Sequence, residues 1–186
     1  IQNQLGERVS VVTEPERRDT FPAIALAASY LKLKKKCEDD EVVVIMPCDP
    51  YTELEYFHTI ARMVECVEKN VADLVLMGIK PTYPSAKYGY VVPFAEGEKY
   101  QIVKRFTEKP DVPTARNYLE EGAYWNGGVF AFRLGYMMQI VRKYMQSGNF
   151  EDTRARYSEF PKISFDYEVA EKAKSVAVVP FNGEWK

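Results

Sequence analysis

A single aspartate placed just past an apolar run is the first feature of this chain that suggests chemistry. The stretch EVVVIMP, residues 41–47, is apolar after its first residue, and Asp49 follows two positions later. A continuous apolar run is typical of a strand that is covered on both faces. In open α/β sheets ligands bind beyond the carboxyl ends of strands, where a carboxylate can hold a cation beside a phosphate. Asp49 is therefore a candidate metal ligand, unless it only caps the following turn or helix.

Alternating strand and helix patterns surround this aspartate. Stretches rich in apolar and β-branched residues predict strands, and stretches with helical periodicity predict helices. In chain order they cover 8–14 (strand), 20–36 (helix), 41–47 (strand), 52–70 (helix) and 72–81 (strand). We expect the first helix to be capped by Thr20, and the second to begin with a capping box formed by Thr52 and Glu55. This order predicts a parallel sheet with helices on both faces.

The second part of the chain changes character. Strands are predicted at 88–94, 100–110, 123–133 and 175–181, and helices at 112–122, 134–146 and 165–173. The first two of these strands are expected to form a hairpin. No internal repeat, low-complexity tract or compositional break marks a linker, so we expect one domain over residues 1–186.

Composition and charge exclude several function classes. The formal net charge of −2 shows none of the basic excess that a general nucleic-acid binder usually carries. No apolar stretch approaches the ~20 residues that are needed to span a bilayer. The three cysteines, Cys37, Cys48 and Cys66, fit neither a zinc site nor a CxxC motif. They are interpreted as free thiols in a reducing cytoplasm.

Six stretches in order carry a resemblance to a known family. They are EPERRDTFPAIALAA (14–28), IMPCDPY (45–51), MGIKPTYPSAKYGYV (77–91), VKRFTEKPD (103–111), YWNGGVFAFR (124–133) and PKISFDYEVAEKA (161–173). Together they resemble the mannose-1-phosphate guanylyltransferases, a family of sugar-nucleotide pyrophosphorylases. Each motif alone is weak, and the order and spacing of all six carry the resemblance. It implies a three-layer, Rossmann-like nucleotide-diphospho-sugar transferase fold with a mixed, mostly parallel central sheet.

The reaction that the resemblance implies is nucleotidyl transfer. GTP and mannose 1-phosphate would give GDP-mannose and pyrophosphate when an oxygen of the sugar phosphate attacks the α-phosphorus in line. Such chemistry needs aligned anions and neutralised charge, largely through Mg²⁺ and basic groups, and it needs no covalent nucleophile. From the cysteines, the charge and the lack of a long apolar stretch we expect a cytoplasmic enzyme with neither nucleic acid nor a membrane as partner. A homodimer is the assembly to test.

The resemblance assigns residues to the nucleotide side of such a site. Asp49 matches the family's metal-binding, catalytic aspartate, although this chain reads Cys-Asp-Pro where the family usually reads Ala-Asp-His. Glu14, Arg18 and Thr20 match the segment beside the guanine base. A solvated turn is the alternative interpretation of the two arginines in this segment.

The sugar side is assigned in the same way. Gly89 matches a loop whose backbone approaches the sugar ring, and Glu108 matches an acceptor for sugar hydroxyls. Lys109 resembles the catalytic residue that meets phosphate, and Asn126 lies where the family contacts the sugar. Asp166 belongs to a segment near the sugar but could equally cap a helix. Plain turns and a β-bulge are the alternative interpretations of the other four.

Two parts of the family pattern are absent from the sequence. The sequence lacks the glycine-rich loop with an arginine that the family carries near its start. It also lacks the second metal-binding aspartate that the family carries after the final strand, where this sequence reads Glu-Trp-Lys at 184–186. We therefore expect a domain that is incomplete at both ends, and a piece that is inactive by itself. Two rivals stay open: a pyrophosphorylase for another sugar and nucleotide, and a catalytically silent sugar-nucleotide-binding subunit.

Overall fold

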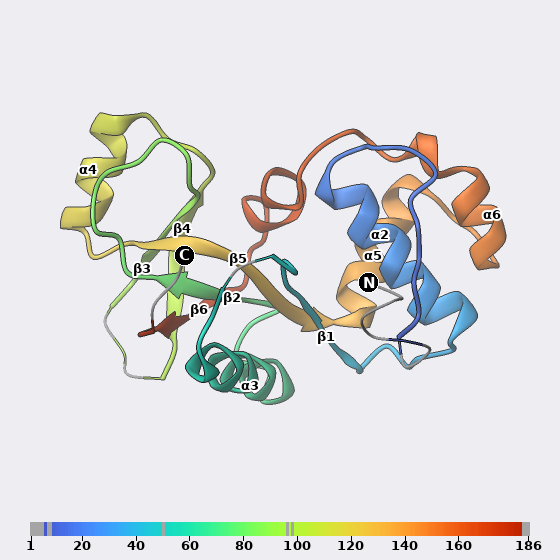
Figure 1. The fold of residues 1–186 in the computed structure, drawn as a ribbon, viewed down its shortest axis with the longest axis horizontal. Coiled ribbons are helices and arrows are strands. Elements are labelled where there is room, and N and C mark those ends of the chain that lie inside the picture. The colour runs from blue at the N-terminus through green and yellow to red at the C-terminus, as the bar shows by residue number, and fades with distance from the viewer. Residues whose placement is uncertain (1–5, 7–8, 50, 96, 98, 184–186) are drawn as a thin grey trace.

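The strands of this chain build one mixed sheet (Figure 1). The computed structural model describes residues 6, 9–49, 51–95, 97 and 99–183. The strands are β1 (Val42–Ile45), β2 (Leu74–Ile79), β3 (Tyr90–Pro93), β4 (Gln101–Thr107), β5 (Tyr124–Arg133) and β6 (Val176–Phe181). Their order is β1-β5-β2-β6-β4-β3, and β3 also pairs with the start of β5. The predicted hairpin of β3 and β4 is confirmed.

The position of β5 decides the topology of the sheet. It lies between β1 and β2 and is antiparallel to both, so these two strands share a direction without being neighbours. Among the described strands, β2 and β6 are the only parallel pair. The mixed sheet is confirmed, whereas the expectation of mostly parallel pairing is wrong. A β-α-β-α-β pattern predicts the direction of successive strands, but a strand from later in the chain can still insert between them.

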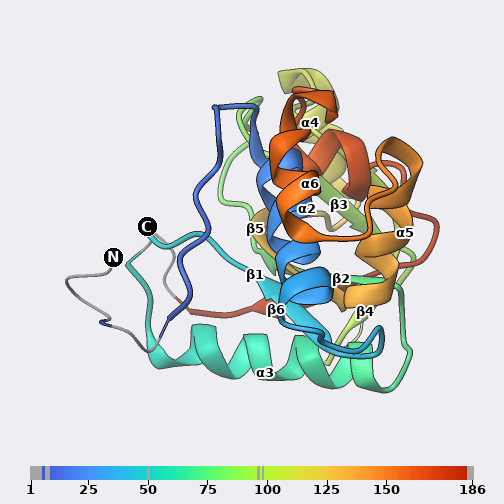
Figure 2. The same ribbon diagram turned by 90° about the vertical axis from the view of Figure 1, so that its right-hand side faces the viewer.

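Helices cover both faces of the sheet, which confirms the three layers (Figure 2). One face carries α3 (Leu54–Glu68), and α4 (Val112–Glu120) packs beside β3. The other face carries α2 (Thr20–Ser29), its π-helical continuation η2 (Tyr30–Lys34) and α5 (Leu134–Tyr144). Short elements complete this face: α6 (Phe150–Ala155), η3 (Tyr157–Glu159) and η4 (Asp166–Ala170).

The alternation of side chains along β2 connects the two hydrophobic cores. Leu74 and Leu76 pack into the core under α2 and α5, while Val75 and Met77 pack into the core under α3. All four are fully buried. Successive residues of a strand point to opposite faces, so an entirely apolar strand must be covered on both sides. The prediction made from the sequence of 72–81 is therefore confirmed.

The first predicted strand is wrong. Residues 9–14 have no strand structure, and Arg8 lies outside the described residues. Val9 and Val11 are exposed, while Val12 packs against the core. β-Branched residues favour a strand only where a partner strand is present to pair with it. The strand β1 also differs from expectation: its residues are half-buried, because β1 lies at the edge of the described sheet.

Both predicted helix caps are wrong. Asp19, with φ 72°, caps α2 by accepting a hydrogen bond from Thr20 N at 2.8 Å. The helix α3 begins at Leu54, and its N-cap Glu53 makes no side-chain capping bond. Glu55 instead pairs with Arg62 at 2.8 Å, about two turns further along the helix. Thr52 lies in an isolated bridge before the helix.

Candidate active site

Four of the predicted sugar-binding positions meet at the end of the sheet where β2 finishes. Asn126 lies on β5 opposite Gly78, and its backbone N donates to the Gly89 carbonyl at 2.8 Å. Its side-chain Nδ2 donates to Asp166 Oδ1 at 2.6 Å, and its Oδ1 accepts from Gly128 N at 3.0 Å. Asn126 therefore bonds both to the loop before β3 and to the start of η4, and it holds these two segments together. The register of β5 against β2 shifts between Leu76 and Gly78, so this stretch also has the irregularity that the alternative interpretation as a bulge expects.

Glu108 closes the site from the end of β4. A Cβ on Gly89 would collide with Glu108 Oε2, so the absence of a side chain at Gly89 is what admits this carboxylate. The Glu108 side chain is 7% exposed, and its Oε1 lies 3.2 Å from Lys109 Nζ. Oε2 is buried and has no hydrogen-bond partner among the residues that the structure describes. A buried acceptor of this kind is costly unless a ligand supplies the missing donor, as a sugar hydroxyl can.

Burial raises the pKa values of both carboxyl groups of the site. Burial, followed by the negative charge of Asp166, raises the pKa of Glu108, and Lys109 acts in the opposite direction. Burial also raises the pKa of Asp166, against bonds from its own backbone and from Asn126. The pKa of Lys109 is raised by its pairing with Glu108. Carboxyl groups held in this way retain protons to higher pH than exposed ones.

This perturbation predicts how stability depends on pH. A carboxyl whose pKa is raised by folding binds more protons in the native state, so its contribution falls as pH rises from the ordinary carboxyl pKa toward the raised one. We expect Glu108→Gln to remove this loss, so that the free energy of unfolding exceeds that of wild type at pH 7 but not near pH 4. Urea unfolding of both proteins across this range measures the difference. A difference that does not change with pH would contradict the assignment.

The three residues predicted to lie beside the base are tied to the segment that leads to Asp166. Glu14 Oε2 accepts from the Tyr157 hydroxyl at 2.6 Å, and Arg18 Nε donates to the Phe160 carbonyl at 3.1 Å. Thr20 Oγ1 accepts from Phe165 N at 2.8 Å. Residues 157–165 therefore hold the segment 14–20 in place and also lead directly to Asp166. Tyr157 was not predicted, and no pattern in the sequence marks it.

Asp49 lies by itself, exposed in the bend beyond β1. Because β1 and β2 share a direction, it follows the same end of the sheet at which Asn126 and Gly89 meet. Within the described residues no group of three or more His, Cys, Asp or Glu side chains is arranged to hold a metal ion. One carboxylate still suits Mg²⁺, which keeps several waters and is commonly bound by one or two carboxylates and substrate phosphates.

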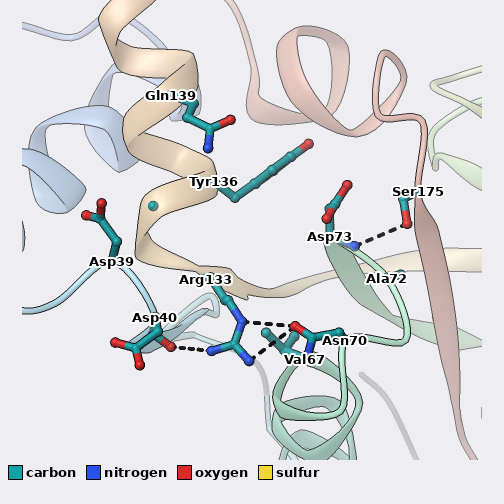
Figure 3. Close-up of a pocket in the computed structure, with 11 residues that line it drawn as sticks. Asp39, Asp40, Val67, Asn70, Ala72, Asp73, Arg133, Tyr136, Gln139 and Ser175 are labelled. Atoms are coloured by element: carbon teal, nitrogen blue, oxygen red, sulfur yellow. Dashed lines mark hydrogen bonds between the residues drawn. The ribbon is translucent and has the colours of Figure 1, made fainter.

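The pocket of about 500 Å³ in Figure 3 lies elsewhere in the molecule. Asp73 and Ser175, which line it, immediately precede β2 and β6, so it lies at the opposite end of the sheet from Asn126. Its Arg133 bonds to the Asp40 carbonyl at 2.6 Å and to Asn70 Oδ1 at 3.3 Å. These bonds join the start of β1 to the end of α3. None of the predicted site residues lines this pocket.

This architecture, a mixed sheet with helices on both faces, is that of a nucleotide-diphospho-sugar transferase. A family model described as "Nucleotidyl transferase" matches residues 1–157, and the chain belongs to this family. Within the described part of the chain, no helix combines the length and apolar character needed to cross a membrane.

The relatives that the chain matches include enzymes of sugar-nucleotide and polysaccharide synthesis. The xanthan biosynthesis protein XanB of Xanthomonas campestris pv. campestris is 34% identical over 98% of this chain and 42% of its own length. A mannose-1-phosphate guanylyltransferase of Salmonella muenchen is 31% identical over 95% of this chain and 41% of its own length. The chain therefore spans less than half of these curated relatives.

Solved structures support the same fold. A structure described as a mannose-1-phosphate geranyltransferase from Thermus thermophilus superposes with a TM-score of 0.84 at 31% identity, covering 100% of this chain and 56% of the other. A UDP-glucose pyrophosphorylase from Acinetobacter baumannii gives a TM-score of 0.62 at 16% identity over 96% of this chain and 55% of the other. The second likeness supports the fold alone.

Proposed function

We propose that this chain is part of a mannose-1-phosphate guanylyltransferase, which converts GTP and mannose 1-phosphate into GDP-mannose and pyrophosphate. One observation carries the proposal: Gly89, Glu108, Asn126 and Asp166, from four separate segments, meet in one partly buried polar site. The relatives named for this reaction, at about 30% identity, support the choice of substrates. The proposal concerns the whole protein, because the chain spans 42% of such a relative.

Mannose would be bound by groups that match its hydroxyls. Glu108 Oε2, buried and unpartnered in the described part of the chain, would accept from one hydroxyl. The Asp166 carboxylate, oriented by Asn126, would accept from another. Lys109, exposed beside Glu108, would meet the phosphate of the sugar as a point charge. These groups would hold the phosphate oxygen in line with the α-phosphorus, which is the main requirement of nucleotidyl transfer.

Asp49 would hold Mg²⁺ together with phosphate oxygens. When bound, such an ion neutralises charge on the triphosphate and orients it. The chain itself contributes an exposed carboxylate at the correct end of the sheet. On the other flank, Glu14, Arg18 and Thr20 would contact the nucleotide from a segment anchored to residues 157–165.

The deciding experiment is a nucleotide screen with the full-length protein. Mannose 1-phosphate and Mg²⁺ would be supplied with GTP, ATP, UTP, CTP or dTTP in turn, and pyrophosphate release would be followed. Release with GTP at a kcat/KM at least about 100-fold above that of the other nucleotides is expected, because a site built to hydrogen-bond one base leaves buried groups unpaired with another.

Other outcomes of this screen would point to the rival functions. Release with a different nucleotide, or only with glucose 1-phosphate, would change the assigned substrates but leave the assigned type of reaction unchanged. A pyrophosphorylase for another sugar and nucleotide is therefore the second candidate. Absence of release with every pair of common nucleotide and sugar phosphate would indicate a silent sugar-nucleotide-binding subunit.

A further inference from the structure

The segment that would face the nucleotide has no regular structure of its own. Residues 10–14 and 17–19 form neither helix nor strand, so the direction of each side chain depends on contacts with other parts of the chain. Glu14 is exposed, yet its Oε2 accepts a hydrogen bond from the Tyr157 hydroxyl at 2.6 Å, across 143 positions of sequence. A bond of this length to a carboxylate is charge-assisted and strongly directional. Tyr157 therefore fixes the position of one oxygen of the Glu14 carboxylate.

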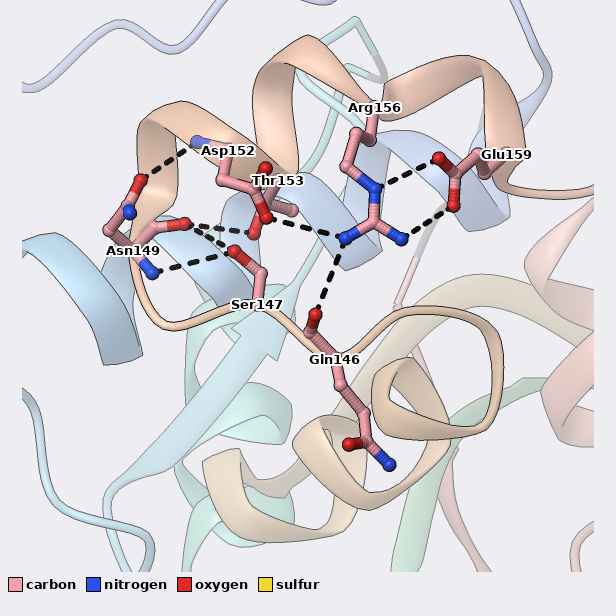
Figure 4. Close-up of polar contacts among 7 residues, drawn as sticks. All are labelled: Gln146, Ser147, Asn149, Asp152, Thr153, Arg156 and Glu159. Atoms are coloured by element: carbon pink, nitrogen blue, oxygen red, sulfur yellow. Dashed lines mark hydrogen bonds and ion pairs between the residues drawn. The ribbon is translucent and has the colours of Figure 1, made fainter.

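Tyr157 is itself held in place by its surroundings. Its side chain is 1% exposed, and its ring packs edge-on against Phe160 with centroids 6.1 Å apart. The neighbouring Arg156 donates to both carboxylate oxygens of Glu159, each at 2.8 Å, and to the Gln146 carbonyl at 3.4 Å (Figure 4). These bonds tie η3 to the end of α5. Tyr157 thus presents its hydroxyl from a rigid support.

The α6 helix completes this support. Asn149 caps its start by accepting from Asp152 N at 2.8 Å, and Arg156 reaches back to Asp152 Oδ2 at 3.4 Å. Ser147 and Thr153 both donate to the Asn149 carbonyl, at 2.7 and 3.2 Å. These bonds hold α6 and the turn before it in place ahead of η3, from which the Tyr157 hydroxyl donates to Glu14.

The chemistry of a carboxylate explains why its orientation matters. A carboxylate has about four acceptor positions, so the bond from Tyr157 leaves the others open. Guanine presents two adjacent donors, N1–H and the 2-amino group, and the two oxygens of one carboxylate can accept both. Adenine presents an acceptor at N1, which a carboxylate repels. Such a pair of parallel bonds needs the carboxylate and the base to lie in one plane.

We infer that Tyr157 is a positioning residue for base selection: its hydroxyl orients the Glu14 carboxylate to accept from N1–H and the 2-amino group of guanine. This inference rests on the proposed function, since it assumes that a guanine nucleotide binds beside the segment 14–20. Tyr157 acts through Glu14 and does not touch the base. Arg18, fixed to the Phe160 carbonyl and to Glu16, limits movement of the same segment.

The hydroxyl remains a donor at every pH at which the protein would work. Burial, and next the bond to Glu14, raise the pKa of Tyr157, and the nearby positive charge of Arg18 acts in the opposite direction. The phenol therefore stays protonated throughout the neutral range. Tyr157 itself should therefore introduce no pH dependence into base selection in the neutral range.

The test compares GTP with ITP, which differs from GTP only in lacking the 2-amino group. Calorimetric binding of each nucleotide to the full-length protein with Mg²⁺ gives the ratio of their dissociation constants. We expect wild type to bind GTP at least about tenfold more tightly than ITP, since one charge-assisted bond distinguishes them. In Tyr157→Phe the ratio should fall about fivefold, because the carboxylate oxygen is no longer fixed in position.

Tyr144→Phe is the matched control. The Tyr144 hydroxyl donates to Glu168, and its ring packs on Phe21 with centroids 5.3 Å apart, so this variant also loses a part-buried tyrosine–glutamate bond. Both variants keep the aromatic ring, and circular dichroism would confirm their folding. The control should keep the GTP to ITP ratio of wild type.

The outcomes separate this inference from the function on which it rests. A wild-type protein that prefers GTP, with an unchanged ratio in Tyr157→Phe, would overturn the role of Tyr157 alone. An equal fall in both variants would also overturn it, because the effect would then be a general loss of stability. A wild-type protein that binds neither nucleotide would overturn the proposed function and this inference together.

Discussion

Asp49→Asn is expected to lower the turnover of the full-length enzyme by about a thousandfold, because a neutral amide binds Mg²⁺ far more weakly than a carboxylate does. The fold should not change, since Asp49 is exposed in a bend and contributes nothing to either hydrophobic core. Steady-state pyrophosphate release measures turnover, and thermal unfolding checks the fold. The loss should be partly recovered at high Mg²⁺ concentration if weaker metal binding is its cause.

Asp40→Asn provides the matched control for this substitution. Asp40 is also exposed, but it lies before β1, at the opposite end of the strand from Asp49. Its carbonyl, which accepts from Arg133, is unaffected by the change of side chain. Turnover close to wild type is expected for this variant. If Asp49→Asn behaved in the same way, Asp49 would not be a metal ligand.

Gly89→Ala is expected to have the second large effect. The new Cβ would collide with Glu108 Oε2 and would lie 3.2 Å from Phe106 Cζ and 3.4 Å from Asn126 Cβ. Relieving this overlap must displace Glu108, whose surroundings are buried. We expect the free energy of unfolding to fall by about 1–3 kcal/mol. We also expect kcat/KM for mannose 1-phosphate to fall about 100-fold, the cost of a small misplacement at a reacting site.

Gly148→Ala tests whether these losses are specific to the position. No atom lies within 4 Å of a Cβ built on Gly148, so that substitution fills open space. It should leave both stability and activity close to wild type. Activity of Gly89→Ala would be measured well below its unfolding temperature, to separate misplacement from unfolding. Unchanged kcat/KM for the sugar phosphate would show that Glu108 does not contact the sugar.

The sequence alone was sufficient wherever a local pattern leaves one structural solution. The apolar run of β2 required burial on both faces, and the structure buries it fully. Likewise, α4 was predicted from its periodicity, and it begins after Asp111, which accepts from Thr114 N at 2.9 Å. The ordered motifs also predicted the family, because they record residue types at fixed spacing. The same motifs predicted a common sugar-binding role for Gly89, Glu108, Asn126 and Asp166, and these four residues lie together in the structure.

The tertiary structure decided what depends on partners distant in sequence. Periodicity reports which residues are buried but not what buries them, so it could not place β5 between β1 and β2. The strand predicted from the residue types at 9–14 is absent, because a strand forms only where a neighbouring strand can pair with it. Thr20 suited a helix cap, yet its hydroxyl accepts from Phe165 N, 145 positions away. The bond between Tyr157 and Glu14 spans 143 positions, and only the folded chain brings the two residues into contact.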